Sequence, residues 1–305
     1  MRDISEKSQT YRTALARAQV YTSPAALEAV RTGKVPKGDV ATYTKAVGLL
    51  ALKRTPDLLP FCHPVALRSG DVQLVCADDH IVIDVSASAV DVTGVEVEVM
   101  TAAALAAMNV YDMLKPLDAQ TRIGSIELVQ KRGGKSDFSD DFGRQLRAGV
   151  LVCSDSVAGG GKADSAGRAV IEALQAAGLS IAQSQVVPDE PSQIAAAVTH
   201  WCDVDKLDLV CTVGGTGLSP RDQTPEAVLP LLERRIEGVD EAIRAYGRQR
   251  TPYADLSRSV AGHRGRTLVI TLPGSTRGAR ESLQAVLPWC LHIVKVFDKS
   301  FRHGH

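Results

Sequence analysis

Three short polar stretches in the first half of the 305-residue chain carry side chains suited to proton transfer and anion binding. They are KGDV (37–40), FCHP (61–64) and VYDMLK (110–115). Asp112 and Lys115 stand three residues apart, so on a helix they share a face and offer an acid and a cation to one ligand. A surface ion pair explains the same spacing, and a histidine such as His63 is more often structural than catalytic.

A glycine-rich turn in the second half has the composition of an anion site. The apolar run Leu207–Val213 leads directly into GGTGLSPRDQTPEA (214–227), where Thr224 is the expected N-cap of a helix. Glycines let backbone N–H groups approach a phosphate, and a helix start beside them favours an anion. A strand–turn–helix joint without a ligand is the alternative for glycines alone. The pair Arg221 and Asp222 in the same turn favours a nucleotide with its metal.

A second glycine-rich segment, SVAGGGKADSAG (156–167), is similar to a phosphate-binding P-loop but fails its pattern. Ser156 and Ala163 occupy positions at which the motif requires Gly and Ser or Thr. We expect a flexible loop that enters a helix over 167–177, with backbone amides free to contact a ligand. The six cysteines contain no C-x-x-C pair, so their spacing indicates no zinc site or redox couple.

The elements that must position these residues differ between the two halves. In the first half we expect a polar opening, a helix over Val40–Leu52, strands over Val72–Cys76 and Ile81–Val85, and a long helix ending near Lys115. This mixture predicts an α+β domain. The second half alternates expected strands, over 149–153, 181–187, 207–213 and 267–272, with expected helices, over 167–177 and 192–201. Strands that run into glycine turns before helices are typical of α/β ligand-binding folds.

The chain is about twice as long as a typical domain, which favours two domains. Between Lys131 and Ala148, glycine, serine and charge replace the apolar periodicity. We therefore predict domains over 1–138 and 148–305, joined by a linker over 139–147.

The charge balance argues against broad electrostatic partners. Lys+Arg and Asp+Glu both total 35, whereas a protein that follows the phosphates of a nucleic acid usually has a basic excess. The longest apolar stretch beside a helix signal, Ala102–Met108, is far shorter than the ~20 residues that cross a bilayer. The N-terminus is charged where a secretory signal needs an apolar core. We expect a cytoplasmic protein that binds neither nucleic acid nor membranes.

The order of the motifs in residues 1–136 resembles the cyclic pyranopterin monophosphate synthase family of molybdenum cofactor biosynthesis. The similarity includes KGDV, ALKRTPDLLPFCHPV (51–65), TGVEVE (93–98), VYDMLK and KRGGKS (131–136). The resemblance implies a ferredoxin-like α+β domain, a lyase that converts a cyclic dihydroguanosine triphosphate to cyclic pyranopterin monophosphate and diphosphate. It assigns catalysis to Lys37, His63, Asp112, Lys115 and Lys131, and substrate binding to Arg12, Cys62, Glu96 and Glu98.

The implied reaction needs cations against the triphosphate and groups that move protons during ring rearrangement. The expected cations are Lys37, Lys131 and Arg12. The expected proton-transfer groups are Lys115, Asp112 and His63. Lys115 is our main candidate for the acid or base, because neighbouring cations lower the pKa of a lysine.

Helix geometry adds a prediction about assembly. If Glu98 and Asp112 lie on one continuous helix, they are within about 40° of each other around the axis but roughly 21 Å apart along it. One small substrate cannot contact both. An antiparallel copy of the helix from a second subunit brings one chain's Glu98 toward the other's Asp112, so we predict a site at a two-fold interface.

Residues 148–300 resemble the molybdopterin adenylyltransferase family. The similarity includes SDSVAGGGKADSAG (154–167), VVPDEPSQI (186–194), the GGTG turn, LSRSVAG (256–262) and LPGSTRGARESL (272–283). The resemblance implies a three-layer α/β molybdopterin-binding domain, a nucleotidyltransferase that joins molybdopterin phosphate to the α-phosphate of ATP with Mg²⁺ and releases diphosphate. It assigns both catalysis and metal binding to Asp189 and Asp222. The ligand-binding positions that it implies are Asp155, Asp164, Gly214, Gly215, Thr216, Gly217, Ser257, Gly274 and Ser275.

Two other functions are open for the second half. One is a non-catalytic pterin-binding or assembly scaffold, and the other is a nucleotide-binding regulator without pterin dependence. Retention of both Asp189 and Asp222 favours catalysis. The expected partners are pterin and nucleotide substrates, further copies of the chain through both domains, and other enzymes of molybdenum cofactor biosynthesis. The two implied reactions are not consecutive, because sulfur insertion comes between them.

Overall fold

The computed structural model describes residues 1–297, so the last residues of the predicted second domain, 298–305, lie outside the described residues. The chain divides into two compact units, Met1–Asp137 and Phe138–His305. The predicted linker, 139–147, forms the first part of the second unit and leads into strand β5 (Arg147–Cys153).

The first unit is built on a four-stranded antiparallel sheet. Its elements are β1 (Thr10–Tyr21), α1 (Pro24–Arg31), α2 (Val40–Leu58), β2 (Leu67–Cys76), β3 (His80–Asp91), α3 (Glu96–Leu114), β4 (Arg122–Arg132) and the 3-10 turn η1 (Lys135–Phe138). The strand order is β2-β3-β1-β4. Both β-α-β connections therefore pass over one intervening strand, an arrangement that a ferredoxin-like fold also has. The ferredoxin-like description itself stays a prediction.

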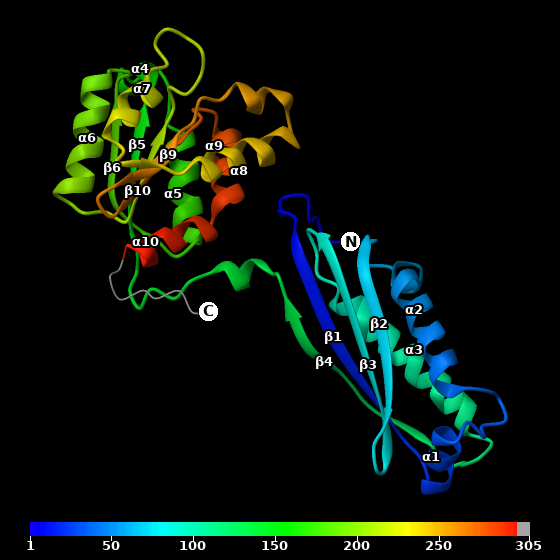
Figure 1. The fold of residues 1–305 in the computed structure, drawn as a ribbon. Coiled ribbons are helices and arrows are strands. Elements are labelled where there is room, and N and C mark those ends of the chain that lie inside the picture. The colour runs from blue at the N-terminus through cyan, green and yellow to red at the C-terminus, as the bar shows by residue number, and fades with distance from the viewer. Residues whose placement is uncertain (298–305) are drawn as a thin grey trace. The chain divides into compact units, whose positions relative to one another are not determined.

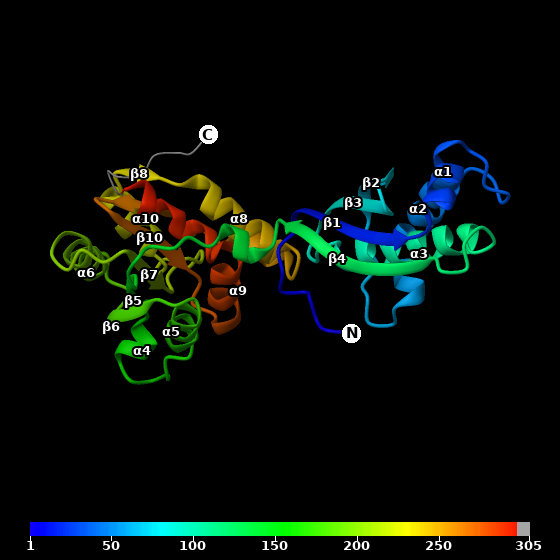
Figure 2. The same ribbon diagram turned by 90° about the horizontal axis from the view of Figure 1, so that it is seen from below.

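Helices α2 and α3 cover one face of this sheet, and the core lies between the helices and the sheet (Figures 1 and 2). Alternate residues of β1 point into this core, as the two-residue period of a strand requires: Ala14, Ala16, Ala18 and Val20. Helix α2 begins where the Asp39 side chain accepts the N–H of Thr42 at 2.6 Å. The KGDV motif is thus a helix start, and it places Lys37 just before α2.

Several elements predicted for the first half are shorter than those in the structure. The expected helix over 40–52 continues through Pro56 to Leu58, and the expected strands are parts of the longer β2 and β3. The predicted polar opening contains β1, one of the two central strands of the sheet. The core positions of β1 are mostly alanines alternating with polar residues, which gives only a weak hydrophobic period.

Helix α3 has the length and apolar content to cross a membrane, as judged by those two properties alone. Half of it is buried inside the first unit, where Ala102, Ala106 and Val110 pack in the core. Helix α3 is therefore the core helix of this sheet.

The second unit is built on a six-stranded mixed sheet with the order β6-β5-β7-β10-β9-β8. Its strands are β5, β6 (Ser180–Val187), β7 (Leu209–Val213), β8 (Arg234–Arg235), β9 (Ala261–Arg264) and β10 (Thr267–Leu272). Its helices and 3-10 turns are α4 (Asp155–Ala158), α5 (Ala166–Ala176), α6 (Pro191–Asp203), α7 (Thr224–Val228), η2 (Leu229–Leu231), α8 (Glu237–Arg248), η3 (Pro252–Leu256), α9 (Thr276–Val286), η4 (Trp289–Leu291) and α10 (His292–Val296). Strands β6, β5, β7 and β10 are parallel to one another, β9 pairs antiparallel with β10, and β8 pairs antiparallel with β9.

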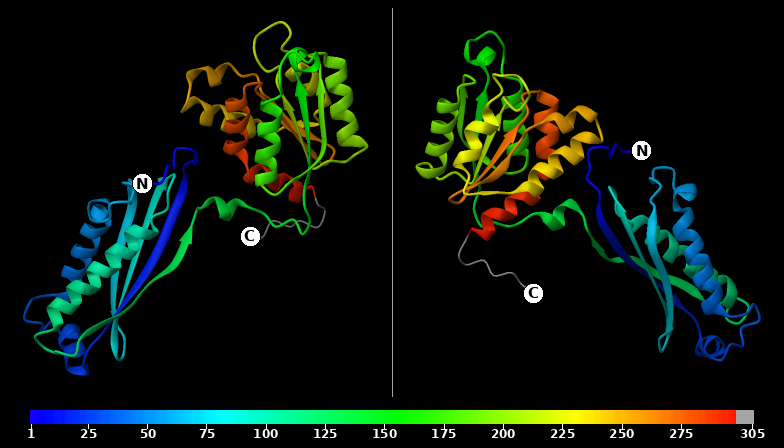
Figure 3. Two further views of the ribbon diagram at one scale, coloured as in Figure 1. Left: turned by 180° about the vertical axis from the view of Figure 1, so that it is seen from behind. Right: turned by 45° about the horizontal axis from the view of Figure 1, so that its top comes forward.

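Helices cover both faces of this sheet, so the unit has an α/β fold. Val150 and Val152 of β5 point into a core shared with α5, α8 and α9. Leu151 and Cys153 point into a second core shared with α6 and α7. Figure 3 shows α6 and α5 on opposite sides of the strands. Because the four parallel strands end at one edge, the loops that follow them meet there, which is where open α/β sheets bind ligands.

Candidate functional sites

The C-terminal end of α3 carries one cluster of predicted synthase residues. Lys37 Nζ donates to the Asp112 backbone oxygen at 2.7 Å and to Oδ2 at 2.6 Å, and Lys115 Nζ lies 2.8 Å from Asp112 Oδ1. Asp112 is thus bound by two lysines, one from its own helix and one that precedes α2. The cluster is more than the local ion pair that the sequence spacing allows.

The charges in this cluster overturn one prediction. The side-chain hydrogen bonds from Lys115 and Lys37 lower the pKa of Asp112 to about 2. The hydrogen bond to Asp112 in turn raises the pKa of Lys115 above its usual value. The expected lowering of the Lys115 pKa is therefore wrong in a single chain, because the nearest charge to this lysine is a carboxylate rather than another cation.

A second cluster lies at the N-terminal end of α3. Glu98 is 2% exposed, Cys62 Sγ donates to its Oε1 at 3.3 Å, and its Oε2 has no hydrogen-bond partner among the residues described. Burial raises the pKa of Glu98, and nearby Glu96 and Asp91 raise it further. Burial and the Glu98 carboxylate also raise the pKa of the Cys62 thiol to about 11. Cys62 therefore acts here as a neutral hydrogen-bond donor.

The remaining predicted residues of the first unit surround this second cluster. Lys131 Nζ, on β4, lies 3.7 Å from Glu96 Oε1. Arg12 on β1 donates to the backbone oxygens of Asp91 and Val92, both at 3.3 Å. His63 is half-buried in the loop between α2 and β2, directly after Cys62. Cations and carboxyl groups thus lie at this end of the helix as well.

The two clusters lie at opposite ends of one helix. Glu98 is in the first turn of α3 and Asp112 in its last, and the predicted continuous helix between them is confirmed. At the rise of an α-helix these positions are roughly 21 Å apart. Within one chain, the structure separates the predicted synthase residues into two groups.

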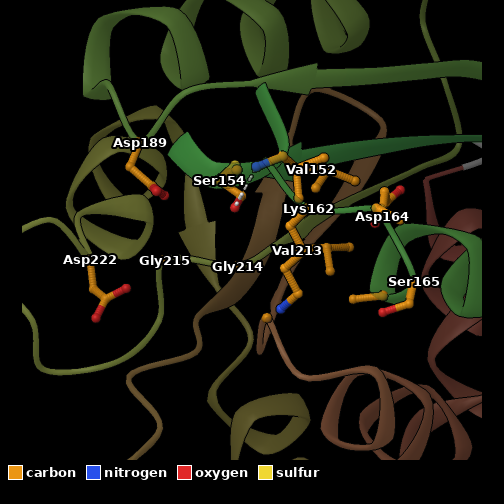
Figure 4. A pocket seen from close by; sticks show the side chains of 15 residues that line it. Val152, Ser154, Lys162, Asp164, Ser165, Asp189, Val213, Gly214, Gly215 and Asp222 are labelled. Atoms are coloured by element: carbon orange, nitrogen blue, oxygen red, sulfur yellow. Dashed lines mark hydrogen bonds between the residues drawn. The ribbon is translucent and has the colours of Figure 1, made fainter. Parts of the chain in front are cut away.

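In the second unit, a cavity of about 160 Å³ lies at the carboxyl ends of β5, β7 and β10. Figure 4 shows Asp189 and Asp222 on one side of it, Lys162, Asp164 and Ser165 on the other, and Gly214 with Gly215 between them. The ends of the strands and the Gly214–Gly215 turn thus form the floor of the cavity, and the loops after the strands supply its polar side chains.

Asp189 is held by a reciprocal pair of hydrogen bonds. Its Oδ2 accepts the N–H of Asp155 at 3.0 Å, and Asp155 Oδ1 accepts the N–H of Asp189 at 3.0 Å. Arg221 donates to both Asp155 oxygens at 3.0 Å and to Glu190 Oε1 at 3.0 Å. Arg221 therefore neutralises Asp155 and Glu190 rather than the two predicted metal ligands.

Asp189 and Asp222 form an acidic pair. Burial raises the pKa of Asp189, and the charges of Asp155 and Asp222 raise it further. Asp222 Oδ2 accepts the N–H of Ser219 at 2.9 Å. Within residues 1–297 no group of three or more His, Cys, Asp or Glu side chains could hold a metal by itself. A carboxylate pair in which Asp222 disfavours the ionisation of Asp189 fits Mg²⁺, which commonly binds through one or two carboxylates and substrate phosphates.

Two glycines make the floor of the cavity possible. Gly214 has φ +110°, and a Cβ there would lie 2.2 Å from the backbone oxygen of Cys153. Gly215 has φ +63°, and a Cβ there would lie 2.2 Å from Thr224 Oγ1. Any side chain at either position would clash, so the close backbone approach depends on glycine. The turn therefore presents backbone rather than side chains to the cavity.

The structure does not bring every predicted ligand residue to this cavity. Asp164 lines it and accepts the N–H of Gly167 at 2.7 Å, and Gly274 lines it as well. Asp155, at the start of α4, and Thr216 and Gly217, in the loop after β7, do not line it. Ser257 and Ser275 line a different cavity, of about 200 Å³, between α8 and the start of α9.

Sequence reasoning missed several residues at this site. Ser154, Lys162 and Ser165 line the cavity. Lys162 follows three glycines, and this glycine-rich context is the feature of the sequence that could have indicated it. Arg258 lies in the LSRSVAG motif, and nothing in its spacing marks it. Its bonds to the Asp222 loop become visible only in three dimensions.

Comparisons with known proteins agree with this two-unit organisation. Residues 1–134 match the model of the MoaC family, and residues 149–292 match a model described as a probable molybdopterin binding domain. A cyclic pyranopterin monophosphate synthase from Roseiflexus sp. is 42% identical over 46% of this chain and 91% of its own length. The crystal structure of MoaB from Thermus thermophilus has 46% identity and a TM-score of 0.48, covering 50% of this chain and 96% of that one.

One relative spans both units. A molybdenum cofactor biosynthesis bifunctional protein from Chlorobaculum tepidum is 37% identical over 292 residues, which are 96% of this chain and 92% of that protein. The order of the two matched families is thus the order of the two units described above. The chain belongs to the family of bifunctional molybdenum cofactor biosynthesis proteins.

Proposed function

We propose that the first unit converts a cyclic dihydroguanosine triphosphate to cyclic pyranopterin monophosphate and diphosphate. Four cations at the two clusters, Lys37, Lys115, Lys131 and Arg12, supply charge against the triphosphate. Each cluster also contains a carboxyl group of opposite character, since Asp112 is ionised and Glu98 has a raised pKa. The pair offers one ionised carboxylate and one carboxyl group that is more easily protonated, two groups that can exchange protons with the substrate during the ring rearrangement.

The raised pKa of Lys115 changes the role proposed for this residue. In the substrate-free protomer it is protonated and paired with Asp112. A triphosphate that binds Lys115 and Lys37 competes with Asp112 for both lysines and frees the carboxylate to accept a proton. Lys115 then acts as cation and proton donor, and Asp112 acts as the base.

We propose that a second copy of the chain completes this site. Helix α3 exposes a stripe of apolar side chains between its two clusters: Val97, Met100, Leu105 and Met108. Apolar stripes of this kind are typical of helices that pack against a partner. Packing two stripes antiparallel about a two-fold axis brings Glu98 of one copy toward Asp112 of the other. The cytoplasmic location and contacts with other cofactor enzymes stay predictions.

We propose that the second unit adenylylates molybdopterin with ATP. The acidic pair Asp189 and Asp222 would hold Mg²⁺, which supplies charge against the phosphates and polarises the α-phosphate. The backbone of Gly214 and Gly215 and the cation of Lys162 face the same cavity and suit the phosphate oxygens. The molybdopterin phosphate then attacks the α-phosphate, and diphosphate leaves. The observation that carries this proposal is the acidic pair beside a glycine floor.

One experiment on the full-length chain tests both proposals. Asp112→Asn and Asp222→Asn are assayed for diphosphate release with the cyclic triphosphate, and with molybdopterin plus ATP. Asp112→Asn should abolish the first activity alone, and Asp222→Asn the second alone. A wild-type chain that binds molybdopterin but transfers no AMP would instead be a pterin-binding scaffold in its second half. Loss of both activities in either variant would contradict independent sites.

A further inference from the structure

We infer that Arg258 is a positioning residue for Asp222, an inference that rests on the proposed adenylyl transfer. Arg258 lies just before β9. Its Nε donates to the backbone oxygen of Gly217 at 2.8 Å, its Nη2 donates to the backbone oxygen of Asp222, and its Nη1 pairs with Glu226 on α7. The Arg258 N–H also donates to the backbone oxygen of Thr216 at 3.1 Å. One arginine thus bonds to the beginning of the loop that carries Asp222, to Asp222 itself and to helix α7, which follows the loop.

These contacts fix the Asp222 carboxylate through the backbone of Gly217 and through the backbone of Asp222 itself. Asp222 Oδ2 accepts the N–H of Ser219 at 2.9 Å and lies against Gly217, where an added Cβ would be 2.8 Å from it. The position of the carboxylate therefore depends on the spacing between the backbones of Gly217 and Asp222. Arg258 bonds to both backbones and sets that spacing.

Arg258 acts through Asp222 and not on a ligand. The cavity beside Asp222 is lined by residues of the described chain that do not include Arg258. Its three side-chain contacts also explain why arginine is needed. A guanidinium presents donors in a rigid planar fork, whereas a lysine has a single nitrogen that cannot reach three separated acceptors. Arg258→Lys keeps the charge and loses the geometry.

The chain contains a matched control at the other end of β9. Arg264 donates to both Asp203 oxygens, at 2.9 and 2.6 Å, and to the backbone oxygen of Leu231 at 3.2 Å. Its side chain is 28% exposed, against 31% for Arg258. The two arginines are equally well anchored, but only Arg258 holds the Asp222 loop. Arg264→Lys therefore measures the cost of the same substitution without an effect on Asp222.

The test compares full-length Arg258→Lys, Arg264→Lys and wild type. Mn²⁺ in place of Mg²⁺ is titrated in the presence of ATP and followed by electron paramagnetic resonance. Arg258→Lys should weaken Mn²⁺ binding on the order of tenfold, as expected when one charge-assisted contact is lost, and Arg264→Lys should leave it unchanged. Thermal unfolding should show similar losses in both variants. Equal Mn²⁺ affinity in the two variants overturns the inference.

Turnover is measured separately, so the two proposals fail in different ways. The Mg²⁺ concentration for half-maximal diphosphate release should rise in Arg258→Lys, with kcat reduced more than the KM for ATP is raised. A wild-type chain that binds Mn²⁺ with ATP but transfers no AMP refutes the catalytic proposal, while the Mn²⁺ comparison still decides the role of Arg258. If Arg258→Lys does not fold, Glu226→Ala removes one of the three contacts. An unchanged Mn²⁺ affinity in that variant overturns the inference.

Discussion

The surroundings of the two sites shift the pKa values of their carboxyl groups in opposite directions. At the end of α3, Lys115 and Lys37 hold the pKa of Asp112 at about 2. At the edge of the second sheet, burial and neighbouring carboxylates raise the pKa of Asp189. The first site supplies its own cations, so an anionic substrate must compete with Asp112 for them. On the proposed adenylyl transfer, the second site lacks charge balance until Mg²⁺ arrives with ATP.

The two sites also differ in where their parts lie. The synthase residues stand at both ends of one 19-residue helix, whereas the acidic pair and the glycine floor come together in loops at one sheet edge. On the functions proposed above, the first site needs a second chain, whereas the second is complete within one. The following predictions test this difference between the two sites.

The largest effect is expected from mixing two inactive synthase variants. Glu98→Ala and Asp112→Ala chains should each lose the first activity, and co-expression should restore about a quarter of it. Half of randomly formed dimers are mixed, and each mixed dimer has one intact site of two. The measurement is diphosphate release from the cyclic triphosphate. Mixing Asp112→Ala with Asp112→Asn is the control and should restore nothing. No recovery in the first mixture would place the whole site within one chain.

A buried carboxyl group outside both sites tests whether a raised pKa marks function. Asp240 on α8 is 0% exposed, and burial raises its pKa from 3.8 to about 6 despite the nearby Arg235. Ionisation of a group with a raised folded pKa disfavours folding. The contribution of Asp240 to wild-type stability should therefore fall by about 3 kcal/mol as the pH rises from about 4 through 6 and stay level above that.

Replacing this group should remove that loss. Asp240→Asn does not titrate, so it should be more stable than wild type above pH 6 and lose the advantage below about pH 4. Urea unfolding at several pH values measures the difference, and both enzymatic activities should stay at wild-type level. A wild-type stability that is independent of pH over this range would contradict the prediction. A loss of either activity would connect Asp240 to a site.

A smaller effect is expected from the one lysine that lines the acidic cavity. No described carboxylate lies within ion-pair distance of Lys162, although Asp164, Asp189 and Asp222 line the same cavity. Lys162→Ala should raise the KM for ATP about tenfold with little change in kcat, because a phosphate contact is lost in both ground and transition states. Lys162→Arg should restore most of the affinity. Arg266→Ala, in the turn at the opposite end of β10, is the control.

The sequence predicts strands that are continuous apolar runs better than strands in which small and polar residues alternate. Buried parallel strands such as β7 and β10 are continuous apolar runs, so they are recognised without tertiary information. Strand β1 fills its core positions with alanine and its outer positions with arginine and glutamine, and its period is visible only when the sheet is known. Helix α2 passes Pro56 because packing in the first unit outweighs the local cost of proline.

The site is predictable in its residue types and less so in its charges. The position of Asp112 and Lys115 on one helix follows from their spacing. The pKa of Lys115 does not, since it depends on which charges surround it in space. Ser257 and Ser275 illustrate the same limit. The family resemblance assigns them to the same ligand site as Gly214 and Gly215, but in the structure they line a separate cavity. Contacts made by backbone oxygens, such as those of Arg258, leave no pattern in the sequence.

The smallest and most direct test of the contrast is a pair of opposite pKa changes. Lys37→Met removes a hydrogen bond that stabilises the ionised form of Asp112, so the pKa of Asp112 should rise from about 2. Asp222→Asn removes a negative charge that disfavours ionisation of Asp189, so the pKa of Asp189 should fall. Carboxyl ¹³C chemical shifts followed against pH in the full-length protein measure both. If the two pKa values changed in the same direction, the two sites would balance charge in the same way. The electrostatic argument for a cation that enters with the nucleotide would then be contradicted.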